Sequence, residues 1–360
     1  MANIKDVARR AGVSISTVSR VLNATKPVSP DLQKKVMDAV HELDYSANIF
    51  AKGLKGASSG IIAVVLTAIS RTFFTTVLEG IHEVAETNGY SMLITETYDD
   101  CKREMRLLSE MASRGVDGII LASSAHAQDE ETLEYIRDLH LLNKNGHVIP
   151  VVSLEFPLDN PHIDAVVIDS EQAAYDATTK LIEECHRKKL VHISLPEEHY
   201  LGRKRIQGFL RALREHGLPV NENSIVEGNY SPESGFHAME EVLSGGREVD
   251  GVFCSNDDMA IGALKACANH KIMVPEQIAV MGNDDIFSAS IISPSLSSIH
   301  VPKTEMGRAA AAKLMERIQQ GEYPEKRDVV SLQYTLIDRQ STVGSRALAD
   351  KNWNWNRMGG

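Results

Sequence analysis

Hydroxyl side chains crowd the stretch "AGVSISTVSR" at residues 11–20, where four of the ten residues are serine or threonine and the last is Arg20. Hydroxyl and guanidinium groups donate hydrogen bonds to phosphate oxygens and to base edges, so this mixture suits contacts with a nucleic acid. The same residues also suit a polar helix on the surface of an ordinary domain. Taken alone, the stretch leaves both interpretations open.

A second set of polar side chains follows apolar runs later in the chain. Asn256 ends the run "GVFCSN" and Asp284 ends the run "IAVMGND", while Arg205 and Tyr230 belong to neighbouring segments. Carboxylates and amides exchange hydrogen bonds with vicinal hydroxyls, a guanidinium adds planar donors, and an aromatic ring stacks on a sugar face. A carboxylate or amide that ends a strand more often caps the next helix, so only the set together indicates a sugar-type site.

Three short helices are expected in the first 46 residues. Apolar residues recur with helical spacing over residues 4–11, and Gly12 then provides a stop. Ser14 is expected to cap a second helix that carries the hydroxyl-rich stretch. A third helix is expected to begin with a hydroxyl cap at Ser29 and a proline at the first helical position, Pro30. The pattern predicts a helix-turn-helix whose second helix presents short polar side chains to a DNA groove.

Residues 46–56, "SANIFAKGLKG", carry two lysines and read as a short helix with Asn48 as its cap. So short a helix containing Gly53 is marginal in water, so we expect it to order only on a partner. An apolar Leu54 in a basic segment suits insertion into a minor groove. A plain interdomain linker is the alternative.

From residue 60 onward, apolar runs alternate with helical patterns in two similar series. This alternation predicts two α/β subdomains with parallel sheets. Ligands of such folds bind beyond the carboxyl ends of the strands, so the cleft between the halves is the expected site.

The composition narrows the class of protein. No apolar run approaches the roughly 20 residues that span a bilayer. The first residues lack the apolar core of a secretion signal, and the four cysteines are scattered, so we expect a cytoplasmic protein with no membrane association. Residues 1–59 contain nine Lys or Arg against five Asp or Glu, whereas the remainder contains 29 against 44. A basic segment on an acidic chain indicates that only the N-terminal part contacts a polyanion.

The N-terminal residues closely resemble the head of the lactose-repressor/galactose-repressor (LacI/GalR) family of bacterial transcription regulators. The shared pattern runs from Ile4 to Asn23 and continues at Val28-Ser29, Tyr45, Asn48, Ala51 and Leu54. The resemblance implies a homodimer on a palindromic double-stranded operator, with base contacts by Ile15, Ser16 and Arg20 and phosphate contacts by Asn3, Ser14, Thr17 and Ser19. It also implies DNA contacts by Asn23, Asn48, Ala51 and Leu54. Ala47 stands where the family usually has proline, which should loosen the hinge.

The body resembles the same family's periplasmic-binding-protein-like core. The resemblance implies effector contacts by Arg71, Phe73, Phe74, Ser123, Glu155, Arg205, Tyr230, Asn256 and Asp284. Three positions depart from the family: Arg71 lies in a segment that usually carries an acid, Asn283 replaces an aromatic, and Glu155 replaces a common aspartate. The extra arginine raises the hypothesis of an anionic effector, a sugar acid or sugar phosphate; a surface position for Arg71 is the alternative.

The expected domains are a helix-turn-helix at 1–46, a hinge helix or linker at 47–58, an effector-binding and dimerisation core at 59–340, and a tail at 341–360. Within the core we expect an N-subdomain of about 59–160 and 292–322 and a C-subdomain of about 161–291 and 323–340.

The expected function is a sequence-specific transcriptional regulator, most simply a repressor, whose operator affinity is set by a small sugar or sugar-derived effector. Inducer and corepressor both fit. A solute-binding protein of a transport system is the alternative, and it predicts a secretion signal and no DNA-binding head. No phosphate loop or catalytic motif follows any expected strand, so we expect no enzyme, no cofactor and no metal site.

Changing Ile15 and Ser16 together should alter which operator sequence is preferred, whereas Arg20→Ala should weaken binding to all operators. The reason is a division of labour in which Thr17, Ser19 and Arg20 dock the helix while Ile15 and Ser16 choose the bases. Selection of bound duplexes from a random pool measures the preference. An unchanged operator ranking in the Ile15/Ser16 variant would contradict this division.

Overall fold

The computed structural model describes residues 2–23, 28–45, 58–125, 130–220 and 224–344. The chain divides into two compact units, a head of residues 1–59 and a body of residues 60–360. Within the described residues, no helix is both long enough and apolar enough to cross a membrane.

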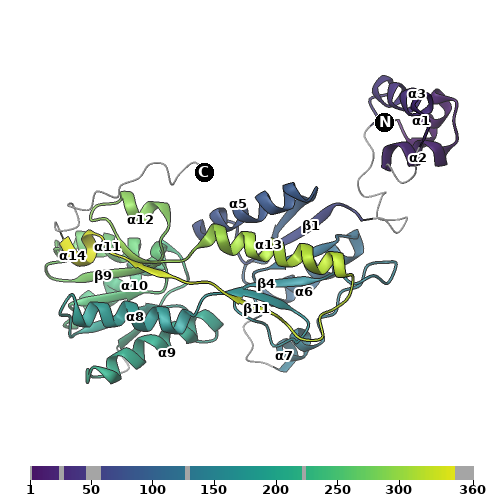
Figure 1. Ribbon diagram of the computed structural model, residues 1–360. Coiled ribbons are helices and arrows are strands. Elements are labelled where there is room, and N and C mark those ends of the chain that lie inside the picture. The colour runs from purple at the N-terminus through teal and green to yellow at the C-terminus, as the bar shows by residue number, and fades with distance from the viewer. Residues whose placement is uncertain (1, 24–27, 46–57, 126–129, 221–223, 345–360) are drawn as a thin grey trace. The chain divides into compact units, whose positions relative to one another are not determined.

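The described residues of the head form three helices (Figure 1): α1, Ile4–Ala11; α2, Ile15–Asn23; and α3, Pro30–Glu42. Asn3 caps α1 with its side chain, and Gly12 ends α1 in the left-handed conformation that glycine adopts readily. Val7, Val18 and Val36, one from each helix, are fully buried and form the centre of a small core. The expected helix-turn-helix is confirmed.

The two expected hydroxyl caps have different outcomes. The backbone N–H of Thr17 donates to the Ser14 hydroxyl at 3.1 Å, as expected for the cap of α2. The cap expected at Ser29 is wrong, because its side chain makes no capping hydrogen bond. Ser29 precedes Pro30, whose ring restricts the preceding residue, and it lies at φ −58° and ψ 145°.

The first sheet of the body defines the N-subdomain, and all its strand pairs are parallel, in the order β11-β5-β4-β3-β1-β2. Its strands are β1, Ile61–Leu66; β2, Ser91–Glu96; β3, Gly118–Leu121; β4, Val151–Glu155; β5, Asp164–Val167; and β11, Val329–Ser331. Its helices are α5, Thr72–Thr87; α6, Cys101–Arg114; α7, Glu130–Arg137; and α13, Lys303–Gln320. The central strands β1 and β3 are buried along their whole length, whereas β2 lies at the edge and is partly exposed.

The second sheet defines the C-subdomain, in the order β12-β10-β9-β8-β6-β7. Its strands are β6, Leu190–Ser194; β7, Ile225–Glu227; β8, Gly251–Cys254; β9, Ala279–Asp284; β10, Ser297–His300; and β12, Thr335–Ile337. Its helices are α8, Ser170–Glu183; α9, Tyr200–Glu215; α10, Pro232–Ser244; α11, Asp257–Asn269; α12, Phe287–Ile291; and α14, Gln340–Val343. Parallel sheets are confirmed except at one edge, because β12 pairs antiparallel with β10.

The chain crosses between the two sheets three times: between β5 and α8, between β10 and α13, and between β11 and β12. The subdomain boundaries expected near 160, 291 and 322 therefore fall several residues before the crossovers. An apolar run shows that a strand exists but does not show which sheet it joins, and residues 164–167 and 297–300 each extend the sheet that precedes the crossover.

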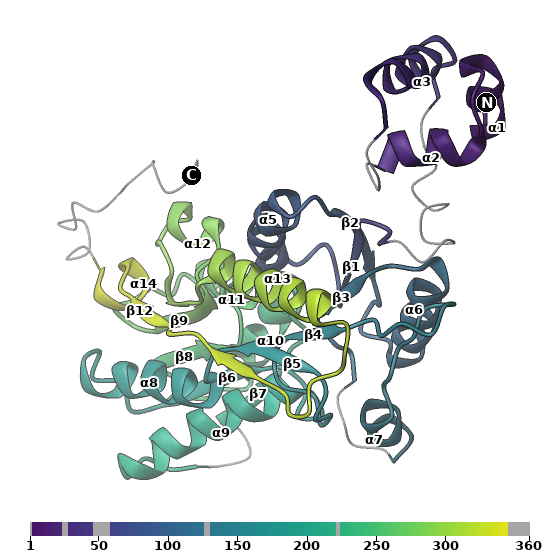
Figure 2. The same cartoon turned by 45° about the vertical axis from the view of Figure 1, so that its right-hand side comes forward.

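Helix α13, which follows the second crossover, packs closely on α5 (Figures 1 and 2). A Cβ atom on Gly80 would lie 2.0 Å from the carbonyl oxygen of Thr304, and one on Gly307 would lie 2.1 Å from that of Val77. The two backbones touch because both contact positions are glycine. This packing holds the middle of α5 against the first turns of α13, and a charged side chain lies at the start of each helix, Arg71 before α5 and Lys303 in α13.

Candidate functional site

Most of the α2 residues expected to contact DNA are exposed, three of them at its start and Arg20 in its last turn. Ser14, Ile15, Ser16 and Arg20 are exposed, while Thr17 is half-buried. The Ser14 hydroxyl shares hydrogen bonds with the hydroxyls of Ser16, at 2.7 Å, and Thr17, at 2.8 Å. Ile15 is 40% exposed, so the start of α2 presents three hydrogen-bonded hydroxyl groups beside one aliphatic side chain.

The other residues expected to contact DNA are placed as follows. Ser19 is half-buried on α2, and Asn3 is exposed, with its side-chain oxygen accepting from the backbone of Lys5 and Asp6. Asn23 ends α2, and its side chain is not described. Asn48, Ala51 and Leu54 lie outside the described residues.

Eight of the nine residues expected to contact an effector line one cleft of the body. They come from the carboxyl ends of strands or from the adjoining loops and helices of both subdomains, as the parallel topology requires. The lining consists of Arg71, Phe73, Phe74, Glu155, Arg205, Tyr230, Asn256 and Asp284, together with Asp258.

Ser123 is the exception, because it is buried and does not line the cleft. Its hydroxyl donates to the carboxylate of Glu104 at 2.9 Å, and the backbone N–H of Ser124 and the Tyr135 hydroxyl donate to the same group. Burial raises the pKa of Glu104 to about 7 despite these donors. Ser123 therefore helps to hold the loop after β3 against α6, which carries Glu104.

The C-subdomain wall of the cleft is built from linked hydrogen bonds. Arg205 donates to the carbonyl of Ser255 at 2.6 Å. Asn256 donates to the carbonyl of Tyr230 at 2.9 Å, and its side-chain oxygen accepts from the backbone N–H of Met259. Asn256 thus caps α11, as the structural alternative held, and also holds Tyr230 in place at the cleft.

The N-subdomain wall is dominated by Arg71, the residue before α5. Its guanidinium donates to the hydroxyl of Thr67 at 2.7 Å and forms an ion pair with Asp99 at 2.5 Å. The same guanidinium lies 3.6 Å from the centroid of the Tyr230 ring, which belongs to the opposite subdomain. Arg71 therefore reaches across the cleft, and its side chain is only 15% exposed. The alternative of a surface position for Arg71 is wrong.

Four cleft residues hold the left-handed backbone conformation that side chains other than glycine rarely adopt. They are Asp99 at φ 57°, Glu155 at 69°, Tyr230 at 73° and Asp284 at 113°. Such conformations cost on the order of 1–3 kcal/mol each and persist where the surrounding structure imposes them, often at binding sites. The cleft thus contains four of the nine such residues in the part of the chain that the structure describes.

Burial shapes the charges of the cleft. It raises the pKa of Glu155 to about 7 against the attraction of the Arg205 and Arg71 guanidinium groups. It also raises the pKa of Asp284 to about 6, again opposed by Arg205 and by Lys303. Both carboxyl groups are therefore poised to accept or release a proton near neutral pH.

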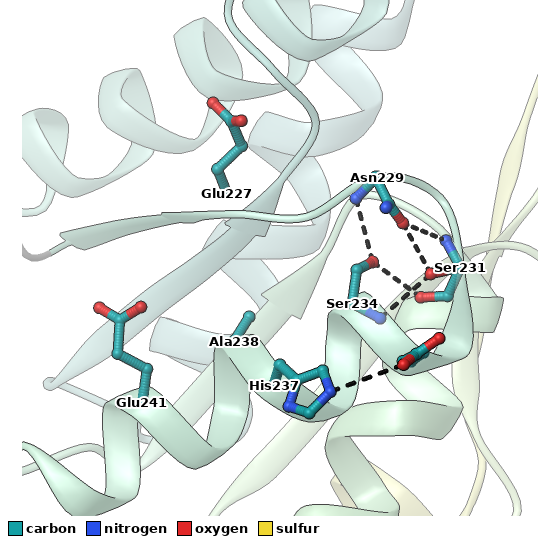
Figure 3. Close-up of a pocket in the computed structure, with 8 residues that line it drawn as sticks. Glu227, Asn229, Ser231, Ser234, His237, Ala238 and Glu241 are labelled. Carbon is teal, nitrogen blue, oxygen red and sulfur yellow. Dashed lines mark hydrogen bonds and ion pairs between the residues drawn. The ribbon is translucent and has the colours of Figure 1, made fainter.

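A larger hollow, of about 350 Å³, lies between β7 and α10, and its lining residues Asn229 and Ser231 flank Tyr230 of the cleft (Figure 3). Its polar side chains bond to one another: the Ser231 hydroxyl donates to Asn229 at 2.6 Å, and Ser234 donates to the carbonyl of Ser231. Glu227 and Glu241 stand apart on its rim (Figure 3). No expected site residue lines this groove, and its internal pairing gives it no clear ligand chemistry.

Comparison with known proteins agrees with both parts of the chain. Residues 3–48 match the family described as bacterial regulatory proteins of the lacI family, and residues 59–339 match the family described as periplasmic binding proteins and sugar binding domain of the LacI family. The chain belongs to the LacI family. The resemblance seen in the sequence is confirmed, and this LacI-family chain is a DNA-binding transcriptional regulator.

Individual relatives cover nearly the whole chain. The HTH-type transcriptional repressor PurR of Pasteurella multocida (strain Pm70) is 33% identical over 341 residues, which is 95% of this chain and 98% of the relative. The PurR of Klebsiella pneumoniae (strain 342) is 34% identical over 344 residues, 95% and 97% of the two chains. These LacI-family relatives are named as transcriptional repressors and not as enzymes.

Two solved structures share the architecture. The complex of the transcriptional regulator CelR with cellobiose has a TM-score of 0.68 at 28% identity and covers 95% of this chain and 100% of that one. The lac repressor dimer bound to operator and the anti-inducer ONPF has a TM-score of 0.78 at 23% identity, with 95% and 99% covered, and shows the common fold.

Sequence reasoning missed three groups at the cleft of this LacI-family chain. Asp258 lines it from the first turn of α11, Asp99 pairs with Arg71, and Lys303 lies behind Asp284. Asp99 follows the apolar run that forms β2, so the strand-end rule that found Asp284 applies to it as well. Lys303 begins a helix, and only the crossover before α13 brings it to the cleft.

We predict that Glu155→Gln makes the free energy of unfolding less dependent on pH. The pKa of this carboxyl group is 4.5 in the unfolded chain, and burial raises this pKa to about 7 in the folded chain. Between these values the unfolded chain binds fewer protons, so the folded state loses stability as the pH rises, by on the order of 1–3 kcal/mol. The urea midpoint should therefore fall less in the variant than in the wild type between about pH 5 and pH 8.

Glu86→Gln, on the exposed face of α5, reports the general effect of removing one carboxylate. A Glu155→Gln chain with the same pH dependence as the wild type would show that burial of Glu155 does not control this loss.

Proposed function

We propose that this chain is a cytoplasmic repressor that binds a palindromic operator as a homodimer and changes its operator affinity when a small polyhydroxylated effector enters the cleft. One observation carries the effector site: eight residues expected from the strand-end pattern and the family resemblance line a single cleft between two subdomains. The relatives named as repressors support the regulatory role.

The chemistry of the cleft supports a neutral sugar over a sugar acid or phosphate. Glu155, Asp258 and Asp284 line the cleft with Arg205, and the charge of Arg71 is already opposed by Asp99. Carboxyl groups exchange hydrogen bonds with vicinal hydroxyls, whereas an anionic ligand would further oppose the ionisation of Glu155 and Asp284, whose pKa burial already raises. The CelR structure with cellobiose, a neutral sugar, supports the same effector class.

Control of DNA binding follows from linkage. An effector that binds one arrangement of the two subdomains more tightly shifts the chain toward that arrangement, and the shift changes operator affinity if the arrangements differ in DNA binding. The three crossovers confine any relative rotation to the connections at 168–169, 301–302 and 332–334. Either sign of control, inducer or corepressor, uses these same parts.

In the head we assign the base contacts to Ile15, Ser16 and Arg20, of which Ile15 and Ser16 select the sequence while Arg20 docks the helix on every operator. We assign the phosphate contacts to Asn3, Ser14, Thr17 and Ser19. Exposure of Ile15, Ser16 and Arg20 on α2 supports the first assignment. The acidic residues of the head that pair with arginine, Asp6 and Glu42, lie on α1 and α3 and leave α2 free of acidic side chains. A helix without carboxylates can approach phosphates without repulsion.

Exposed apolar side chains on the body support a homodimer. Ile94 and Tyr98 are 39% and 63% exposed at the edge strand β2 and just after it, and Phe287 and Ile291 are 51% and 53% exposed on α12. Apolar side chains of this size gathered at an edge strand and a short helix favour burial against a second copy. A second copy would bring two heads to the two half-sites of a palindrome.

A solute-binding protein of a transport system shares the body but has no use for a DNA-binding head. The three-helix head with its polar α2 therefore favours the regulator.

Operator selection from a random duplex pool, repeated with candidate sugars, tests the proposal. We expect a palindrome bound by two chains, and a change of operator affinity of at least about tenfold with one neutral sugar but not with its uronate or phosphate. Fluorescence anisotropy of a labelled operator measures both affinity and stoichiometry.

Asp284→Asn should keep operator affinity and lose most of the sugar response, because it removes one acceptor from the cleft. Asp338→Asn is the matched control, since Asp338 pairs with Lys180 outside the cleft lining. A pool without a palindrome would contradict the DNA-binding half of the proposal, and a full sugar response in Asp284→Asn would contradict the position of the effector.

A further inference from the structure

The centre of the cleft is filled by the chain itself. The free volume there is about 20 Å³, room for about one water molecule, whereas ligand pockets generally offer roughly 300–1,000 Å³. The filling group is the Arg71 side chain, which stands between the two subdomains. A sugar-sized molecule therefore has no space in this arrangement unless Arg71 moves.

The groups around Arg71 complement the flat face, the positive charge and the terminal N–H donors of its guanidinium group. The Tyr230 ring faces the flat cation at 3.6 Å, a distance suited to both stacking and cation–π attraction. The Asp99 carboxylate accepts from one terminal nitrogen at 2.5 Å, and the Thr67 hydroxyl accepts from the other at 2.7 Å. The ring, the carboxylate and the hydroxyl come from three different loops, so the fold assembles a complete site for this group.

The three recognition groups do not depend on Arg71 for their own positions. Tyr230 is held by the hydrogen bond that its carbonyl accepts from Asn256. Thr67 is buried directly after β1, and Asp99 precedes α6, where the neighbouring Asp100 caps the helix. Removing the Arg71 side chain should therefore leave Tyr230, Asp99 and Thr67 in place around an empty site.

We propose that Tyr230, Asp99 and Thr67 form a guanidinium subsite inside the cleft, that the chain's own Arg71 fills this subsite, and that an effector must displace Arg71 to bind. The displacement extends the proposed effector site and rests on it. The subsite itself does not depend on DNA binding. Arg71 thereby acts as a specificity-determining residue, because a ligand gains the Tyr230 face only by replacing the contacts that Arg71 loses.

Truncation of Arg71 gives a direct test with a small probe. Arg71→Ala should bind methylguanidinium saturably, detected by titration calorimetry and by a rise in the melting temperature of the full chain. Methylurea has nearly the same shape without the charge. It should bind at least about tenfold more weakly than methylguanidinium. The wild-type chain should bind neither probe saturably at the same low concentrations, because Arg71 occupies the subsite.

Two further variants make the test specific. Arg211 lies 4.2 Å from the ring of Tyr175 and pairs with Glu171, outside the cleft lining, so Arg211→Ala removes a similar arginine and should not create methylguanidinium binding. Arg71→Ala combined with Asp99→Asn should lose the binding, since asparagine tolerates the left-handed backbone of Asp99 but carries no charge. If Arg71→Ala does not fold, Arg71→Gln keeps most of the side chain and should still bind methylguanidinium more tightly than the wild type does.

Equal responses of the wild type and the Arg71 variants to methylguanidinium, or binding that survives Asp99→Asn, would overturn the subsite. Such a result in a chain that still binds its operator and responds to a sugar would leave the proposed function intact. Loss of operator selection in the wild type would contradict the proposed function without bearing on the probe measurement.

Discussion

The ammonium group of Lys303 joins the two subdomains behind the cleft. Lys303 begins α13 in the N-subdomain and donates to the backbone carbonyls of Asp284 and Asp285 at the end of β9, in the C-subdomain. Asp285 in turn holds His300 at 2.8 Å and Arg339 at 2.6 Å. The carboxyl group of Asp284 therefore faces the cleft while its carbonyl is tied to the crossover, so a ligand that shifts Asp284 acts on the connection between the two halves.

Arg71 and Lys303 occupy corresponding places on two closely packed helices, Arg71 directly before α5 and Lys303 as the first residue of α13. The glycine contacts between α5 and α13 bring the helix backbones together, and Arg71 and Lys303 lie at the starts of these helices. One cation reaches forward to Tyr230 and the other reaches back to Asp284. Rotation of the helix pair relative to the C-subdomain would change both contacts together.

Local sequence patterns predicted much of this molecule because local physics decides those features. The glycine stop at Gly12 and the hydroxyl of Ser14 set the ends of head helices, and Asn256 and Asp284 were found because parallel strands bring their carboxyl ends to one edge. The crossovers were misplaced because periodicity does not say which sheet a strand joins. Ser123 was misplaced because its partner, Glu104, comes from a helix 19 residues earlier.

The partner of Arg71 shows a different limit of sequence reasoning. Its charge alone suggested an anionic ligand, but long-range packing supplies Asp99 from another loop and Tyr230 from the other subdomain. The strand-end pattern can place Asp99 and Tyr230 at the cleft, but it does not show that both contact Arg71 and that Asp99 neutralises its charge.

The coupling between the cleft and the DNA-binding head is tested most directly by the reciprocity of sugar and operator binding. The affinity of the full chain for the sugar found in operator selection is measured by calorimetry with and without saturating operator duplex. Saturating operator should change the sugar affinity by the same factor by which the sugar changes operator affinity, because linkage makes the two factors equal. A sugar affinity that is identical with and without operator would contradict it.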